Sequence, residues 1–402
     1  MAGGLSFPYD VEKEMDAKVD LSKQIVGEKT PSRFLALDAL RGLIMIVMAL
    51  DHANLFIAQK HSSGEYWGGA FPHYSDTLSF LTRFVTHLAA PGFFFLMGIS
   101  LVLFAHSRRR QGWSEWTILR HFWMRGILLM ALQLLLINRA WELSPAGWEL
   151  NIYIGVLFAL GAAMIIGSLL LRLNQTTLLV VTTLLFLGTE LLVPEPSMWG
   201  QAVFVEPIDY LSLILLTPGG NLELWSNYPL LPWLELVTFG IVFGNWLASD
   251  RVKTIKLALP IGSTFLLFFV ILRSIGGFGN IRTQVGERWI DFLNVVKYPP
   301  SMTFTLLTMG LILLLLWLFA LISEKSSRIL LPLEVYGSAP LFFYIVHLFT
   351  YAALGIGLTP SGTSIPAMYP YWIVGLLILL PITYAYSNLK QRQSLNSILR
   401  FF

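Results

Sequence analysis

Apolar residues are grouped along this chain in long runs that recur from residue 34 to residue 386 and are separated by short polar segments. Each run is close to the roughly 20 residues that a helix needs to cross a bilayer. A further apolar stretch, 210–216, is too short to span and is expected at the outer interface. The pattern predicts ten membrane-spanning helices, at 34–57, 80–105, 118–138, 150–172, 176–193, 229–249, 255–273, 301–322, 334–355 and 368–388.

The composition indicates the same class of protein. Apolar residues make up 55% of the 402 residues and charged residues only 13%, whereas a soluble domain carries about 25% charged residues. These values exclude an ordinary soluble enzyme and a disordered or fibrous chain. The expected fold is an all-α, polytopic integral membrane bundle of about ten helices. We expect a polar N-terminal tail at 1–33, a single transmembrane domain at 34–390 and a short C-terminal tail at 391–402.

Lysine and arginine are distributed unevenly over the segments between the predicted helices. With the N-terminus inside, 17 of the 27 basic residues fall on inside segments and seven on outside segments. Because cytoplasmic segments are enriched in Lys and Arg, both termini are expected in the cytoplasm, and the net charge of +3 does not point to nucleic acid. The chain has no cysteine, which excludes disulfides, thiolate metal sites and a cysteine nucleophile; it also has no HExxH motif or phosphate-binding loop.

The first predicted helix carries the most informative polar residues: Asp38, Arg41, Asp51 and His52. Ionisable side chains at bilayer depth are costly and are functional candidates by default. Arg41 and His52 are eleven positions apart, which returns to within about 20° of the same helix face, roughly 16 Å further along the axis. Asp38 can pair with Arg41 three residues later. Asp51 points about 100° away from His52, so the pattern does not show that it orients His52.

Other predicted helices repeat this order in depth. Arg125 lies in the inner half of the third helix, whereas His87, Glu235 and His347 lie towards the outer ends of the second, sixth and ninth helices. Arginine makes bidentate contacts to phosphate, and histidine is the usual general base near neutral pH. The arrangement suits a molecule with an anionic head held inside and a reactive end further out. Each residue also has an ordinary structural explanation, because arginines anchor cytoplasmic helix ends and buried histidines often only pack.

Five segments carry a recognisable pattern, in this order: 38–42 with 51–52, 86–92, 228–233, 292–301 and 337–347. Together they resemble the bacterial branch of the heparan-α-glucosaminide N-acetyltransferase family of membrane-bound acyltransferases. The resemblance runs from about Arg33 to about Leu389. It implies that acetyl-CoA or another acyl-CoA binds from the cytoplasm and that the acyl group passes to a sugar or amino-sugar acceptor on the far side. No metal is expected.

The resemblance and the depth order together suggest roles for individual residues. The expected catalytic group is His52, with His347 and Asp51. The expected CoA-binding group is Arg41, with Arg125 and Asp38. The residues expected to line the acceptor side are His87, Glu235, Lys297, Tyr298 and Ser301, of which Glu235 matches no family motif and is included for its depth alone.

Several alternatives stay open at this point. His52 either removes a proton from the acceptor as it attacks the thioester or forms a covalent acetyl-histidine. A different class of protein is a proton-coupled transporter, in which Asp51, His52, Glu235 and His347 form a proton relay. The lack of an internal repeat weighs against it. We expect the protein among the lipids of a bacterial cytoplasmic membrane, with a homodimer as one open oligomeric state.

Overall fold

A computed structural model describes residues 34–61, 72–144, 152–193, 207–220, 223–393 and 397. The expected N-terminal tail at 1–33 lies outside these residues, and of the expected C-terminal tail only 391–393 and 397 are described. The expected division into two tails and one domain therefore stays a prediction. Everything below concerns the compact unit Leu35–Phe402, within its described residues.

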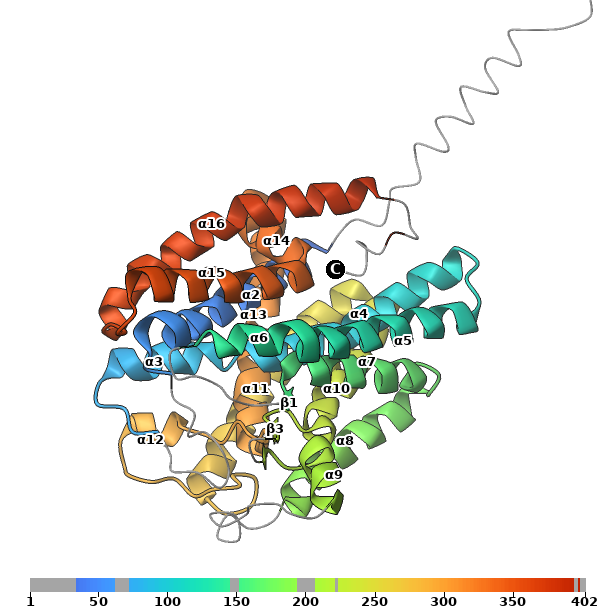
Figure 1. Ribbon diagram of the computed structural model, residues 1–402. Helices are drawn as coiled ribbons and strands as arrows, with labels where there is room; N and C mark the ends of the chain where they lie inside the picture. The colour runs from blue at the N-terminus through green and yellow to red at the C-terminus, as the bar shows by residue number, and fades with distance from the viewer. Residues whose placement is uncertain are drawn as a thin grey trace, which may run out of the picture. The chain divides into compact units, whose positions relative to one another are not determined.

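Helices make up most of the described chain (Figure 1). The α-helices are α2 (Leu35–Ala53), α3 (Thr77–Thr86), α4 (Ala89–Arg110), α5 (Glu115–Leu132), α6 (Asn138–Glu142), α7 (Val156–Leu170), α8 (Gln175–Leu192), α9 (Pro207–Leu215), α10 (Leu230–Ser249), α11 (Arg251–Ile275), α12 (Trp289–Leu293), α13 (Met302–Lys325), α14 (Leu331–Ser338), α15 (Pro340–Leu358) and α16 (Ile365–Arg392). Two π-helical turns, η1 (Asn54–Ala58) and η2 (Gln133–Ile137), and one 3₁₀ turn, η4 (Ser327–Leu330), complete the helical elements. Strands β1 (Ile152–Ile154), β2 (Gly219–Gly220) and β3 (Leu224–Ser226) form a small sheet in the order β1-β3-β2, with β1 parallel to β3 and β2 antiparallel to it.

The predicted all-α membrane bundle is confirmed, with one difference in the number of long helices. Within the described residues, nine helical segments are long and apolar enough to cross a membrane. The fourth predicted span, 150–172, is instead strand β1 followed by the 15-residue helix α7, with residues 150 and 151 outside the described part of the chain. The apolar run is continuous, but residues 152–154 pair with β3, so the helix begins only after Gly155. The short stretch 210–216 falls mostly within helix α9.

Two of the predicted spans are broken near prolines. Within 80–105, α3 ends at Thr86 and α4 begins at Ala89, with Pro91 in its first turn. Within 334–355, α14 ends before Ala339 and α15 begins at Pro340. Proline has no backbone N–H and disfavours helical geometry in the residue before it. The hydropathy of a segment does not depend on this backbone effect of proline. The apolar pattern therefore predicted a continuous helix over each of the two spans.

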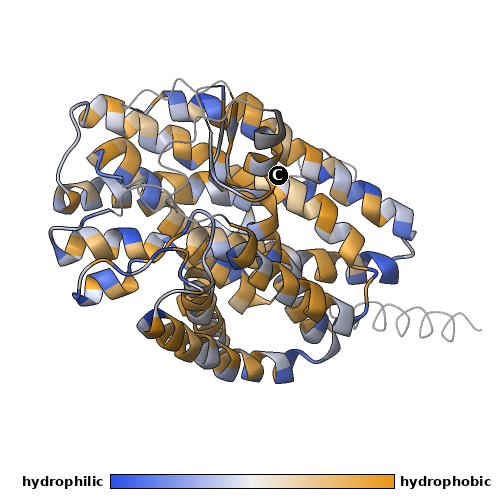
Figure 2. Cartoon of the chain, turned by 90° about the horizontal axis from the view of Figure 1, so that it is seen from below, coloured by the Kyte–Doolittle hydropathy of each residue, from blue (hydrophilic) through white to orange (hydrophobic). Residues whose placement is uncertain are grey.

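The outer helices present apolar side chains away from the protein. On α8 and α11, Leu191 is 70% exposed and Leu267 is 59% exposed. Figure 2 shows hydrophobic residues along most helices, with many hydrophilic residues at helix ends and connections. A soluble protein rarely exposes contiguous apolar surface of this extent, whereas lipid tails match it. The chain is therefore a multi-pass membrane protein.

Helix α2 is surrounded by other helices of the bundle. It packs against α4, α13, α14 and α15, and most of its residues are buried. Its contact with α14 depends on two glycines: Gly42 lies against the backbone carbonyl of Leu333, and Gly337 lies against that of Asp38. Small residues allow membrane helices to approach this closely.

We expect Gly42→Ala to destabilise the protein, because the added Cβ would overlap the Leu333 carbonyl group. Overpacking of this kind costs typically 1–3 kcal/mol, so the cost is expected at roughly that level. The midpoint of thermal unfolding in detergent measures the effect. Gly357→Ala is the matched control, because a Cβ at Gly357 has no neighbour within 4 Å. Equal midpoints for the two variants would contradict the close packing of α2 on α14.

Candidate active site

Two cavities lie next to each other along α2. The first, here named the arginine cavity, has a volume of about 200 Å³ and is lined by Arg41. The second, the histidine cavity, has a volume of about 100 Å³ and is lined by His52. Phe93 of α4 and Tyr344 of α15 line both, so the cavities meet at these two side chains. The structure thus gives each end of α2 its own compartment.

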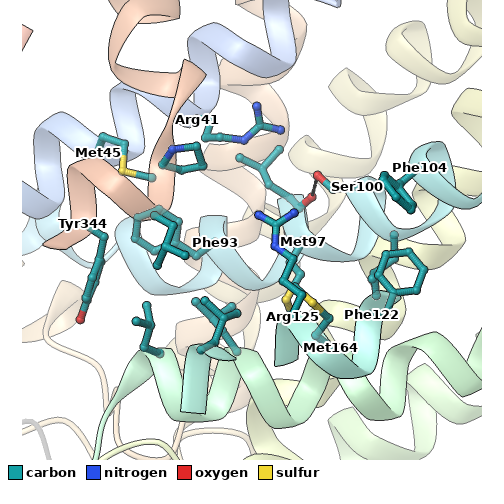
Figure 3. A pocket seen from close by; sticks show the side chains of 17 residues that line it. Arg41, Met45, Phe93, Met97, Ser100, Phe104, Phe122, Arg125, Met164 and Tyr344 are labelled. Atoms are coloured by element: carbon teal, nitrogen blue, oxygen red, sulfur yellow. Dashed lines mark hydrogen bonds between the residues drawn. The ribbon is translucent and has the colours of Figure 1, made fainter. Parts of the chain in front are cut away.

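The arginine cavity combines mostly apolar walls with two guanidinium groups. Arg41 donates a hydrogen bond of 2.6 Å to the Asp38 carboxylate. Arg125 extends from α5 towards the same cavity, and Figure 3 shows the guanidinium groups of Arg41 and Arg125 on it. The Nε of Arg125 has no hydrogen-bond partner among the described residues. Among the described residues, Asp38 is the acidic side chain that pairs with Arg41 in this cavity, so two guanidinium groups face one carboxylate. The cavity therefore suits the anionic part of a slender, largely apolar molecule.

His52 and His347 form a buried hydrogen-bonded pair in the second compartment. The Nδ1 of His52 lies 2.6 Å from the Nε2 of His347, and the Nδ1 of His347 lies 3.0 Å from the carbonyl oxygen of Phe343. A carbonyl oxygen only accepts, so His347 carries its proton on Nδ1 and, when neutral, accepts at Nε2. His52 then donates from Nδ1, which leaves the Nε2 of neutral His52 with a free lone pair. The edge of Trp141 packs on the same imidazole.

Asp51 belongs to a neighbouring charged cluster. Its carboxylate pairs with the guanidinium of Arg83 and accepts a 2.8 Å hydrogen bond from Thr86. The Nε2 of His61 lies 3.3 Å from Asp51 and 3.0 Å from the Nη1 of Arg83. Guanidinium groups only donate, so neutral His61 accepts from Arg83, while protonated His61 can donate to Asp51. Asp51 therefore binds Arg83, Thr86 and His61, and the Nδ1 of His52 is held by His347.

The segment between α11 and α13 brings Lys297 and Tyr298 to the histidine cavity. Arg273, at the end of α11, is 3% exposed and donates to three backbone carbonyls at residues 291–294, which holds this segment in place. The ammonium of Lys297 lies 4.9 Å from the centre of the Tyr298 ring. The Tyr298 hydroxyl lies 3.3 Å from that of Tyr228. Burial and the neighbouring Tyr298 raise the pKa of Tyr228 well above its ordinary value, so Tyr228 stays protonated.

Five of the expected site residues line neither of the two cavities. Asp38 and His347 are bonded to the lining residues Arg41 and His52, whereas Glu235, Ser301 and His87 lie apart from both cavities. The carboxylate of Glu235 accepts a 2.7 Å hydrogen bond from Thr305 between α10 and α13. The hydroxyl of Ser301 caps α13 by accepting from the backbone N–H of Phe304. His87 lies at the junction of α3 and α4, where its ring packs against Phe304. These contacts are ordinary packing and capping interactions.

Other residues in or beside the two cavities were not predicted from the sequence. Arg83 is 2% exposed and contacts Asp51 and His61, which line the histidine cavity. Its place in an apolar stretch was a usable signal, because a charge at that depth needs a partner. His61 lies nine residues after His52 and beyond the regular helix, so no period connects it with the site. Tyr344 and Trp141 are aromatic residues in aromatic-rich helices and carry no distinguishing pattern.

These features define a multi-pass membrane protein with adjoining cationic and histidine-lined cavities inside its helices. Residues 33–274 match the family model described as heparan-alpha-glucosaminide N-acetyltransferase, catalytic. The match covers more than half of the chain, and the chain belongs to this family. The expectation drawn from the five segments is thus confirmed, and membership implies an acetyltransferase.

Two curated proteins are similar over part of the chain. Heparan-alpha-glucosaminide N-acetyltransferase of Homo sapiens is 28% identical over 140 residues, which are 35% of this chain and 19% of the human protein. The Mus musculus protein of the same name is 30% identical over 139 residues, again 35% of this chain and 19% of the relative. The matched part of this chain therefore spans about a fifth of these relatives. Lys297, Tyr298 and His347 lie beyond the residues that match the family model.

Proposed function

We propose that the protein transfers an acetyl group, or another acyl group, from acyl-CoA to an amine or hydroxyl of a sugar-like acceptor. The observation that carries this proposal is the pair of cavities along α2, one with arginines and one with histidines, which meet at Phe93 and Tyr344. Acyl transfer needs one site for the donor and one for the base and acceptor. The family supplies the reaction class, and the cavities supply the two compartments.

The arginine cavity is the proposed donor site. Arg41 and Arg125 would bind phosphate groups of CoA, since guanidinium matches phosphate in charge and geometry. Asp38 fixes the side chain of Arg41 through their hydrogen bond. The apolar walls suit the pantetheine arm, and the shared side chains Phe93 and Tyr344 mark where the thioester would enter the histidine cavity.

The histidine cavity is the proposed place of reaction. The Nε2 of His52 takes the proton of the acceptor amine or hydroxyl as the nucleophile attacks the thioester carbonyl. The carbon–sulfur bond then breaks, and the imidazolium returns the proton to the leaving thiolate. His347 positions His52 and stabilises the imidazolium through their hydrogen bond. Tyr298, Lys297 and Tyr344 line the cavity and are the candidate donors to the oxyanion. Covalent transfer through an acetylated Nε2 of His52 is the alternative route.

His61 is a second candidate base in the same cavity. Its distance of 3.3 Å from the Asp51 carboxylate gives it the form of the carboxylate–histidine pairs that serve as general bases. Arg83 opposes this role, because it neutralises Asp51 and donates to the neutral ring. Substitution of each histidine by glutamine separates the two assignments.

The proposed orientation places the Arg41 end of α2 at the cytoplasm and the His52 end outside, which follows from the distribution of basic residues. Acyl-CoA is made in the cytoplasm, so the donor would enter from that side and the acceptor from the other. We place the protein in a bacterial cytoplasmic membrane. The rival transporter requires a continuous proton relay, whereas Glu235 bonds to Thr305 and lines neither cavity.

Thiol release from acetyl-CoA by the purified protein in detergent tests the proposal, with glucosamine as the probe acceptor. The chain has no cysteine, so a thiol reagent detects released CoA without a background from the protein. We expect release that depends on the amine in detergent, where no proton gradient exists. No release by folded protein with several amino sugars would overturn the proposal, and uptake of a sugar into vesicles that requires a proton gradient would favour the transporter.

A further inference from the structure

A third cavity, here named the polar basin, lies beside the charged cluster of Asp51. It has a volume of about 610 Å³ and is lined mostly by polar residues, among them Asn54, Lys60, Ser79, Arg83 and Ser364. These residues come from η1 and the segment after it, from α3, and from the N-cap of α16. None of the roles assigned above uses this cavity.

Arg83 connects the polar basin with the histidine cavity. It lines the basin, and its guanidinium contacts Asp51 and lies 3.0 Å from the Nε2 of His61. Asp51 and His61 both line the histidine cavity. The two cavities are therefore separated by a single layer of polar side chains. A molecule in the basin lies within one side-chain layer of the proposed reaction.

Asn54 is an independent sign that the basin takes a ligand. Its side chain is 4% exposed, and its Oδ1 has no hydrogen-bond partner among the described residues. A buried polar atom without a partner costs stability, so its retention calls for an explanation. Asn54 also begins the π-helical turn η1, and such turns occur frequently at functional sites. Asn54 lines the basin, so a small rotation of its side chain would bring this amide to a hydroxyl or N–H of a bound molecule.

The histidine cavity and the polar basin differ in the size of molecule that each can hold. The histidine cavity, at about 100 Å³, has room for the reacting groups but not for a large acceptor. The basin, at about 610 Å³, has a volume typical of sites for drug-sized ligands, which range over roughly 300–1,000 Å³. Its amide, hydroxyl and ammonium groups suit a neighbour rich in hydroxyl groups more than an acyl chain.

We propose that the polar basin is a second acceptor subsite, which holds a saccharide unit adjacent to the one that carries the reacting amine or hydroxyl. This inference rests on the proposed function. It identifies the preferred acceptor as an oligosaccharide or glycoside of at least two units. Asn54 hydrogen-bonds the second unit, and Lys60 and Ser79 contact it from the rim of the basin. Arg83 lies between this unit and the histidine cavity.

The test compares glucosamine with the β-1,4-linked disaccharide of glucosamine as acceptors, at saturating acetyl-CoA. We expect kcat/KM of the wild type to be about tenfold higher for the disaccharide, as one or two net hydrogen bonds would give. Asn54→Leu and Lys60→Ala should lower the disaccharide value towards that of glucosamine and leave the glucosamine value unchanged. Lys253→Ala, an exposed lysine at the start of α11, is the matched control.

Each outcome separates this inference from the proposed function. Acetylation of both acceptors with equal kcat/KM by the wild type would overturn the subsite and leave the transferase in place. A preference for the disaccharide that survives in both variants would also overturn it. If neither sugar is acetylated, the proposed function fails and the subsite fails with it. Should Asn54→Leu not fold, Lys60→Ala and Ser79→Ala decide the question, because both residues lie at the rim.

Discussion

Replacing His52 by glutamine is expected to lower the rate of acetyl transfer by roughly 10²–10⁴-fold, the usual contribution of a general base. Glutamine keeps a donor and an acceptor near His347 but has no lone pair basic enough to take the proton of the acceptor. Affinity for acetyl-CoA should not change, because His52 lines the histidine cavity and not the arginine cavity. Thiol release gives kcat, and calorimetry on the same preparation gives the dissociation constant.

His106→Gln is the matched control for this experiment, because His106 is exposed on α4 and lines neither cavity. His61→Gln is the decisive comparison. If His61→Gln loses activity and His52→Gln retains it, the base is His61 with Asp51, and His52 serves only the packing of α2 on α15. If both variants keep full activity, neither histidine is the base, and the proposed chemistry of the cavity is wrong.

Most of the fold could be predicted because apolar runs of about 20 residues leave a chain few alternatives in a membrane. Nine predicted spans correspond to long apolar helices within the described residues. The exceptions have local causes that hydropathy does not measure. Pro91 and Pro340 interrupt two runs, and residues 152–154 pair with β3, more than 70 positions away. Strand pairing of this kind is a tertiary effect, so no local pattern reports it.

The candidate site shows the same division between local and tertiary information. Arg41 and His52 could be placed on one helix face because the helical period relates them. The bond between His52 and His347 joins residues 295 positions apart, and depth alone gave no reason for it. Depth also grouped Glu235 with the site, although it packs against Thr305 elsewhere. Burial depth is a property of one helix, whereas membership of a cavity depends on how several helices pack.

Replacing Arg41 by alanine is expected to weaken acetyl-CoA binding by roughly 10–100-fold, the loss that follows from removing one hydrogen bond to a charged group. Arg125→Ala should have a similar effect, because its guanidinium faces the same cavity and its Nε has no partner among the described residues. Arg109→Ala is the matched control, since Arg109 pairs with Glu115 at an exposed site and lines neither of the two cavities.

Calorimetric titration with acetyl-CoA and with acetyl-pantetheine, which lacks the nucleotide and its phosphates, shows whether the arginines contact the phosphates. Both substitutions should weaken only the binding of acetyl-CoA. An equal loss of affinity for both thioesters would show that the arginines act on the shape of the cavity rather than on phosphate. Unchanged affinity in both variants would remove the arginine cavity as the donor site and direct the search for the CoA entrance to another face of the helices.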